Sequence, residues 1–255
     1  MKLASFLLAT LLAAPLSLSA VAPAGAAENS AALGAKILQV ADKKASAYPN
    51  QSYTASMTIF KGGTQTKTMV FDMKMKDLEK QYIHFTKPGD VAGMKVLMTD
   101  ADTIYIYTPE FKKVRRVAAH TQSQGFLGSE FSPEDMKLAK LSEAFDAEVL
   151  GKKGSETTLA LTPKRADVTS YAKLEIVIDS KVGGITTIRY IDGSGKAVRV
   201  QTRGQWKTAG KAKIPTRITM KNLKTGDETV IEMTNIDVKT EISDDIFSRR
   251  TLLRG

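Results

Sequence analysis

The sequence has 255 residues, of which 42% are hydrophobic, and a formal net charge of +10. This length and apolar content suffice for one sizeable domain with its own core. The absence of cysteine excludes disulfides, thiolate metal sites and a lipobox cysteine. The basic charge suits an anionic membrane surface or acidic partners, and it equally suits a soluble protein with solvated lysines. No compact basic block is interleaved with stacking aromatics, so nucleic acid is not an expected partner.

The first segment, Met1–Ala27, has the pattern of a secretory signal peptide. Lys2 gives a positive start, Phe6–Leu18 is an apolar run, and Ala24-Gly25-Ala26 offers a small-residue cleavage site. An uncleaved anchor is the alternative, but the run is short for a bilayer. We therefore expect export to the periplasm of a diderm bacterium and one mature domain over residues 28–255.

The mature sequence begins with an expected amphipathic helix, Asn29–Ala47, and then changes to a two-residue period. Alternating segments fill residues 51–117 and 147–238, and the clearest are Gln65–Lys76 and Thr103–Thr108. We count about eleven strands. The short turns between them indicate an antiparallel meander with one apolar face.

A second helix is expected after the loop that contains Gly125 and Gly128. Ser132 can cap it, Pro133 suits its first position, and two acids follow at the positive end of the dipole. It would run toward Leu141, with a third helical piece near Ser142–Phe145. The predicted fold class is mainly β with a few helices, with a long sheet that curls into a barrel or half-barrel and helices that cover its concave face.

Methionine is concentrated in the first half of the chain, where five of the ten methionines lie between Met57 and Met94. Flexible, polarizable methionine suits a surface that repacks around varied apolar ligands. We predict a cavity for acyl chains on the apolar face of these strands; the alternative is an ordinary core filled by methionine. The predicted lining consists of Met57, Ile59, Met69, Phe71, Met73, Met75, Ile83, Phe85, Val96 and Met98.

Three stretches carry a resemblance to a known family: Lys113–Arg116 followed by Phe126–Met136, Ile214–Ile218, and Asn235–Val238 followed by Ile242–Phe247. They resemble outer-membrane lipoprotein-sorting proteins, relatives of the periplasmic lipoprotein carrier LolA, whose pattern reads roughly "P…KRVRR…F.GSDF.YEDL". Glu130 stands where aspartate is usual, and Pro133 stands where tyrosine is usual. The resemblance covers roughly residues 30–250.

The resemblance implies a half-open β-barrel like that of LolA and LolB, with an apolar cavity. A member would carry lipoprotein acyl chains or a lipid, as a monomer, from an inner-membrane transporter of the RND or lipoprotein-release type toward the outer membrane. The family motif implies a cavity rim made of Arg115, Arg116, Phe126, Gly128, Ser129, Phe131, Glu134 and Asp135. Adjacent arginines alternate in side on a strand, so one of Arg115 and Arg116 would face the cavity. The alternative for the two arginines is an ion pair with Glu134 or Asp135.

No motif in the sequence indicates an enzyme, a metal site or a cofactor. The two histidines, His84 and His120, are not in a zinc-binding arrangement, and there is no G-x-S-x-G nucleophile elbow. A hydrolase would need one of these histidines to meet a serine and an acid in the fold. A second alternative is an envelope interaction protein, for example an accessory to an RND-type transporter, which would have a filled core and no lipid.

Overall fold

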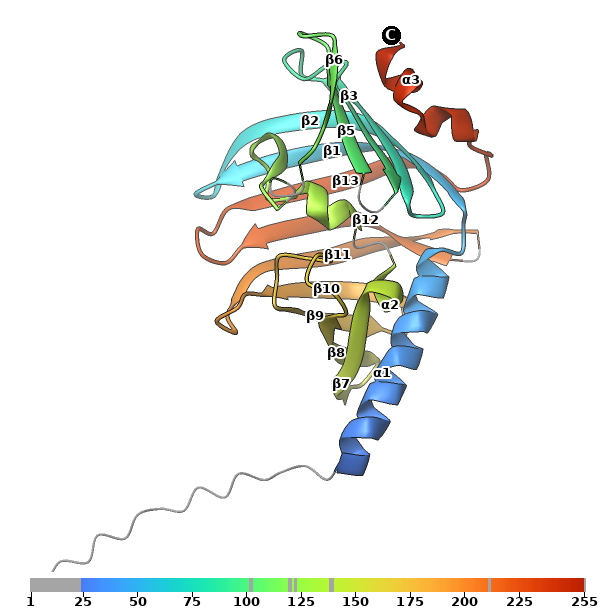
Figure 1. The fold of residues 1–255 in the computed structure, drawn as a ribbon, viewed down its shortest axis with the longest axis vertical. Coiled ribbons are helices and arrows are strands. Elements are labelled where there is room, and N and C mark those ends of the chain that lie inside the picture. Colours follow the sequence, from blue (N-terminus) through green and yellow to red (C-terminus); the bar gives the residue numbers. More distant parts are fainter. Residues whose placement is uncertain are drawn as a thin grey trace, which may run out of the picture.

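The computed structural model describes residues 24–100, 103–118, 121, 123–137, 140–210 and 212–254. Its centre is one open, curled sheet of thirteen antiparallel strands in the order β6-β5-β4-β3-β2-β1-β13-β12-β11-β10-β9-β8-β7 (Figure 1). The strands are β1 Asn50–Lys61, β2 Thr64–Lys76, β3 Lys80–Lys87, β4 Lys95–Asp100, β5 Thr103–Thr108, β6 Lys113–Arg116, β7 Phe145–Lys153, β8 Glu156–Pro163, β9 Lys173–Asp179, β10 Gly184–Ile191, β11 Ala197–Ala209, β12 Ala212–Asn222 and β13 Glu228–Asp237. This confirms the predicted mainly-β class and meander.

Thirteen strands replace the predicted count of about eleven. Almost every strand pairs with its neighbour in sequence. The exception lies at the centre, where β1 pairs with β13. That pairing joins two meanders, one running outward from β1 to the edge strand β6 and the other from β13 to the edge strand β7. The strands that carry the methionines and those near the C-terminus therefore form one continuous concave surface.

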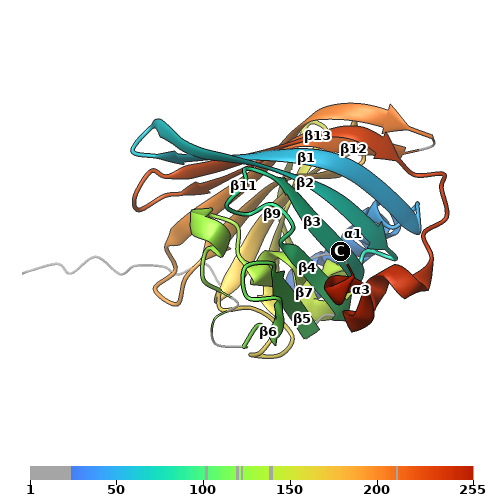
Figure 2. The ribbon, with the colours of Figure 1, turned by 90° about the horizontal axis from the view of Figure 1, so that it is seen from above.

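The first helix, α1, spans Ala24–Ala45, so it begins and ends earlier than predicted. It packs mainly on β7 and on the short helix α2 Leu141–Ala144, and it also touches β10, all on the concave side of the sheet (Figure 2). A Cβ atom on Gly34 would lie 2.6 Å from the Ala147 carbonyl oxygen, so only glycine allows this close approach to β7. The predicted signal peptide lies outside the described residues, except that residues 24–27 open α1.

The helix predicted from Ser132 is much shorter than expected. The structure has a single 3-10 turn, η3 Pro133–Lys137, and a short helix, α2 Leu141–Ala144; Leu138 lies outside the described residues. The capping contact is also the reverse of the predicted one. Ser132 was expected to accept a hydrogen bond through its side chain, whereas its backbone N–H donates to Asp135 Oδ2 at 2.7 Å. The acids predicted for a long first turn are instead bound to other elements, and these tertiary contacts override the local helix signal.

Three apolar clusters stabilise the fold. One lies between α1, α2 and β7–β10, and includes Leu159, Leu161, Leu174 and Ile176. A second, rich in methionine, lies on the concave face of β1–β5 and β13. The third lies on the opposite face of β3–β6, where Leu97 meets the C-terminal elements η4 Asp244–Phe247 and α3 Arg249–Leu253. The predicted covering of the concave face is thus complemented by a C-terminal helix on the outer face, which the sequence pattern did not predict.

Candidate functional site

An apolar cavity of about 230 Å³ lies between the concave face of the sheet and a segment that crosses it, residues 126–136. We call residues 126–136 the cover segment. The strands contribute Tyr53, Met57, Phe71, Met73, Gln81, Ile83, Phe85, Val96, Ile104, Ile106, Gln201, Arg203, Ile218, Ile231 and Met233, and the cover segment contributes Phe126, Ser129, Phe131, Ser132, Pro133, Asp135 and Met136. Side chains from both meanders therefore meet around one space.

The residues predicted to line a cavity fall into three groups. Six of them lie in its wall: Met57, Phe71, Met73, Ile83, Phe85 and Val96. Ile59, Met69 and Met98 are buried in the surrounding apolar cluster and are not part of the wall. Met75 lines a second cavity toward α1, described below. The period-2 pattern thus placed all ten side chains on the concave side, but it did not resolve which of them border open space.

The first part of the cover segment, residues 126–131, is a tight turn, and the side chain of Phe126 lies in the cavity wall. Leu127 and Gly128 both have positive φ, at 54° and 81°, and the Phe126 N–H donates to the Phe131 carbonyl oxygen at 2.7 Å. The Phe126 ring lies 6.0 Å from that of Phe85, which lies 5.3 Å from that of Phe71. This row of tilted rings joins the cover segment to β3 and β2 by apolar contact.

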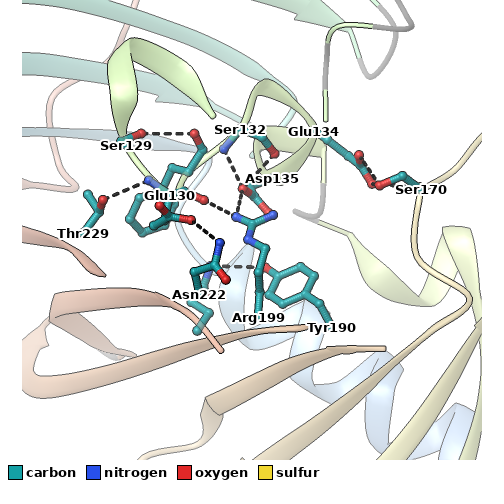
Figure 3. Close-up of polar contacts among 12 residues, drawn as sticks. Ser129, Glu130, Ser132, Glu134, Asp135, Ser170, Tyr190, Arg199, Asn222 and Thr229 are labelled. Atoms are coloured by element: carbon teal, nitrogen blue, oxygen red, sulfur yellow. Dashed lines mark hydrogen bonds and ion pairs between the residues drawn. The ribbon is translucent and has the colours of Figure 1, made fainter. Parts of the chain in front are cut away.

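A buried ion pair holds the back of the cover segment to β11 (Figure 3). Arg199 Nη2 lies 2.8 Å from Asp135 Oδ2 and also donates to the Glu130 carbonyl oxygen, while Arg199 Nη1 donates to the Tyr171 hydroxyl oxygen at 2.6 Å. Burial opposes the charge of Arg199, but Asp135 and Tyr171 together raise its pKa above the usual value. Both Nη atoms of the guanidinium are therefore engaged with the cover segment and Tyr171, while its Nε is buried without a hydrogen-bond partner.

Two further acids of the cover segment are anchored elsewhere, Glu134 to the loop before β9 and Glu130 to the ends of β1 and β12. Glu134 accepts hydrogen bonds from the Thr169 hydroxyl and from the Ser170 backbone N–H, the latter at 2.7 Å. Glu130 accepts from Lys61 Nζ at 2.8 Å and from Asn222 Nδ2 at 3.2 Å. Glu130, Glu134 and Asp135 thus fasten the cover segment at three points, and none of these carboxylates is left to pair with a strand β6 arginine.

Arg115 and Arg116, the predicted rim arginines, lie on the edge strand β6 and are exposed. Arg115 is opposite Ile106, on the concave face, whereas Arg116 is opposite Tyr105, on the outer face. The alternative prediction, an ion pair of these arginines with Glu134 or Asp135, is wrong because both acids are bound elsewhere. Neither arginine lines the cavity.

A second cavity, of about 530 Å³, adjoins the first on the side of α1. Tyr53, Arg203, Ile218 and Met233 line both cavities. The sequence pattern did not indicate this half of the site, because the concave-face positions of β11 are polar, namely Arg199, Gln201 and Arg203, whereas the apolar Val198 and Val200 alternate with them on the other face. The sequence signal that could have indicated this cavity is the spacing of Arg199, Gln201 and Arg203 at every second position of one strand, which puts three polar side chains on one face.

The described part of the chain carries no cluster of acidic, histidine or cysteine side chains that could hold a metal ion. His84 lies partly buried on β3, where burial and, to a smaller extent, Lys95 lower its pKa, and His120 lies outside the described residues. In the same described ranges, none of the helices is long and apolar enough to cross a membrane. The walls of the two cavities are predominantly apolar and include a few charged side chains, among them Arg203 and Asp135.

A family model described as "uncharacterized protein" matches residues 77–254. Among solved structures, a domain from Vibrio parahaemolyticus named for outer-membrane lipoprotein sorting is 21% identical, with a TM-score of 0.78 over 88% of this chain and 100% of that one. A DUF1329-family protein from Desulfovibrio piger is 22% identical, with a TM-score of 0.80 over 88% of this chain and 99% of that one. A LolA-superfamily protein from Nitrosomonas europaea is 19% identical, with a TM-score of 0.71 over 86% of this chain and 99% of that one. No curated protein matches the sequence.

Proposed function

Because this chain belongs to the family whose model matches residues 77–254, and has the fold of LolA-like outer-membrane lipoprotein-sorting proteins, we propose that it is a periplasmic carrier of an amphiphile. The cargo is a lipid or the acyl chains of a lipoprotein. The protein shields the apolar chains from water during transfer and makes or breaks no covalent bond.

The observation that carries this proposal is the apolar cavity beneath the cover segment. Burial of an acyl chain is favourable by roughly 0.8 kcal/mol per methylene group. A cavity that already exists takes up the chain without a separate opening of the core. Methionine side chains in its wall can adjust their rotamers to chains of different length or shape.

The cover segment supports a mechanism for opening the cavity. It contacts the sheet through the Phe126 ring and through the polar anchors at Glu130, Glu134 and Asp135, and all of these contacts can be exchanged for contacts with water or ligand. In the closed state it keeps a large apolar surface from solvent, which an empty carrier needs in order to avoid aggregation. We propose that the cover segment moves away from the sheet when cargo enters.

The proposed partners follow from the cargo. The protein would work as a monomer and receive the amphiphile from an inner-membrane transporter of the RND or lipoprotein-release type. The signal-like first segment, Met1–Ala27, supports the periplasm as the place of transfer.

Binding of a fluorescent fatty acid to the purified protein tests the proposal. Met73→Asp introduces a charge into the cavity wall, and Ile83→Trp adds bulk there, so both should reduce binding strongly. Leu223→Asp, the same kind of apolar-to-acidic change at an exposed position of β12–β13, should leave binding unchanged. Circular dichroism of each variant verifies that it is folded.

Saturable binding by the native chain that both cavity variants lose, with the Leu223 variant unaffected, is the expected result. No uptake of the probe by the folded native chain would contradict the carrier proposal and would favour an envelope interaction protein. Normal binding by folded Ile83→Trp would place the ligand somewhere other than this cavity.

A further inference from the structure

Arg203 is a cation in the wall that the two cavities share. It lies on the concave face of β11, and its Nε donates to Gln201 Oε1 at 2.7 Å. Gln201 in turn donates from Nε2 to the Tyr190 hydroxyl oxygen at 3.5 Å, which fixes its oxygen toward the guanidinium. One edge of the Arg203 side chain is thus held in place by a neutral neighbour.

Arg203 differs in its partners from Arg199, four residues earlier on the same face of the same strand. Arg199 forms a buried ion pair with Asp135, whereas among the described residues no carboxylate lies within ion-pair distance of Arg203. Burial lowers the pKa of Arg203, as expected for a cation removed from water without an acidic neighbour. Arg203 is half-buried, and a cation that loses part of its hydration without an acidic neighbour is stabilised when a partner of opposite sign is supplied.

The charged groups around Arg203 favour an anion in the second cavity. Its lining includes three lysines, Lys44, Lys181 and Lys213, and one acid, Asp42, which already accepts a hydrogen bond from the Ser142 N–H at 2.6 Å. The lysines are exposed and therefore lie toward solvent, while Arg203 lies deeper. The first cavity has one acid in its lining, Asp135, which is paired with Arg199, and its remaining wall is predominantly apolar.

We propose that Arg203 binds the anionic head of the carried amphiphile, a carboxylate or phosphate oxyanion, in the second cavity, while the acyl chain occupies the first. This inference rests on the proposed carrier function and adds a requirement about the charge of the cargo. The planar guanidinium offers two parallel N–H donors to such a head, and the lysines attract it on entry. The shared wall gives one continuous path from the charged end to the apolar end.

The test compares amphiphiles with the same chain and different heads: palmitate, hexadecanol, a lysophosphatidylglycerol and a lysophosphatidylcholine. Their affinities are measured by displacement of a neutral fluorescent acyl probe from the native chain, from Arg203→Met and from Arg203→Lys. Arg189→Met removes the same charge from an exposed position on β10 and serves as the matched control. Inorganic phosphate alone is added as a competitor to test whether the head binds without a chain.

We expect the native chain to bind palmitate about tenfold or more tightly than hexadecanol. Arg203→Met should lose this preference and still bind hexadecanol normally, Arg203→Lys should keep only part of it, and Arg189→Met should keep all of it. Stronger competition by palmitate than by lysophosphatidylglycerol identifies a carboxylate head, and the reverse identifies a phosphate head. Competition by inorganic phosphate alone at comparable concentration would overturn the assignment to an amphiphile.

The outcomes separate this inference from the function on which it rests. If no probe or amphiphile binds the folded native chain, the carrier function itself fails. If hexadecanol and palmitate bind equally well, or if Arg203→Met keeps the preference for palmitate, the carrier function stands and the assignment of Arg203 is wrong.

Discussion

The two ends of the concave face are covered in different ways. At the α1 end, a 22-residue helix packs on side chains that are completely buried, among them Leu159, Leu161 and Leu174 at 0% exposure. At the methionine-rich end, the short cover segment leaves a cavity of about 230 Å³. The sheet is thus densely packed where α1 lies on β7–β9, which we call the filled end, and it holds open space under the cover segment and beside the C-terminal end of α1, where the second cavity lies.

The physical origin of the difference is how closely each covering element approaches the strands. Gly34 lets α1 lie directly on the β7 backbone, so side chains on both sides interdigitate. The cover segment is held by the polar anchors at Glu130, Glu134 and Asp135, whose partners lie on the sheet and on the loop before β9. Anchors at fixed distances prevent the segment from collapsing into the space below it.

The largest expected effect comes from removal of an anchor. Arg199→Met leaves Asp135 buried without its partner, and should lower the free energy of unfolding by about 3–5 kcal/mol in urea titrations. Arg217→Met breaks an exposed pair with Glu232 and should cost about 0–1 kcal/mol. Equal losses in the two variants would mean that the Arg199 pair does not hold the cover segment.

Truncation of one side chain at each end sharpens the comparison. Leu174→Ala at the filled end should cost about 2–5 kcal/mol because the surrounding core cannot collapse onto the new void. Met73→Ala should cost less, because Met73 already borders open space and makes fewer contacts on that side. Thermal unfolding of both variants checks the order, and a larger loss for Met73→Ala would contradict the assigned difference in packing.

Gly34→Ala tests the close approach of α1. The added methyl group would overlap the Ala147 carbonyl, so the helix must move and the protein should lose about 1–3 kcal/mol despite the better helix propensity of alanine. Ala35→Gly, at a neighbouring exposed helix position, is the control for propensity alone and should cost about 1 kcal/mol. A stabilised Gly34→Ala variant would show that the space between α1 and β7 accommodates the added methyl group.

The smallest expected effect concerns the outer face. Hydrogen bonds from Lys76, at 2.9 Å, and from Lys80, at 2.7 Å, lower the pKa of Asp244 to about 2. The folded-state pKa lies below the unfolded value, so this anchor contributes stability above about pH 4 and loses it as pH falls toward 2. The protection of the α3 amides, that is, their exchange rate divided into the intrinsic rate at the same pH, should fall over this window, and in Asp244→Asn it should already be lower at neutral pH and change less. Identical profiles for the two proteins would remove Asp244 as the cause.

Local alternation was sufficient to predict most of the sheet. The strand Thr103–Thr108 has the predicted bounds, and the methionine-bearing strands present the predicted face to the interior. Alternation could not predict the inward face of β11, because Arg199, Gln201 and Arg203 are polar and their burial depends on partners distant in sequence. For the same reason the strong helix signal at Ser132 gave a single turn, since the side chains of Glu134 and Asp135 are held by Ser170 and Arg199, which are distant in sequence. The cavity residues that belong to an alternating apolar pattern could be predicted from the sequence. The residues whose positions depend on partners distant in sequence could not.

The most direct test of the central claim, that the cavity holds an acyl chain, is native mass spectrometry of the mature protein purified from an envelope fraction, followed by lipid extraction. We expect a near-stoichiometric adduct with the mass of an acylated molecule, absent from Ile83→Trp purified in the same way. A clean mass of the folded native protein, with no adduct and no uptake of added fatty acid, would contradict the claim.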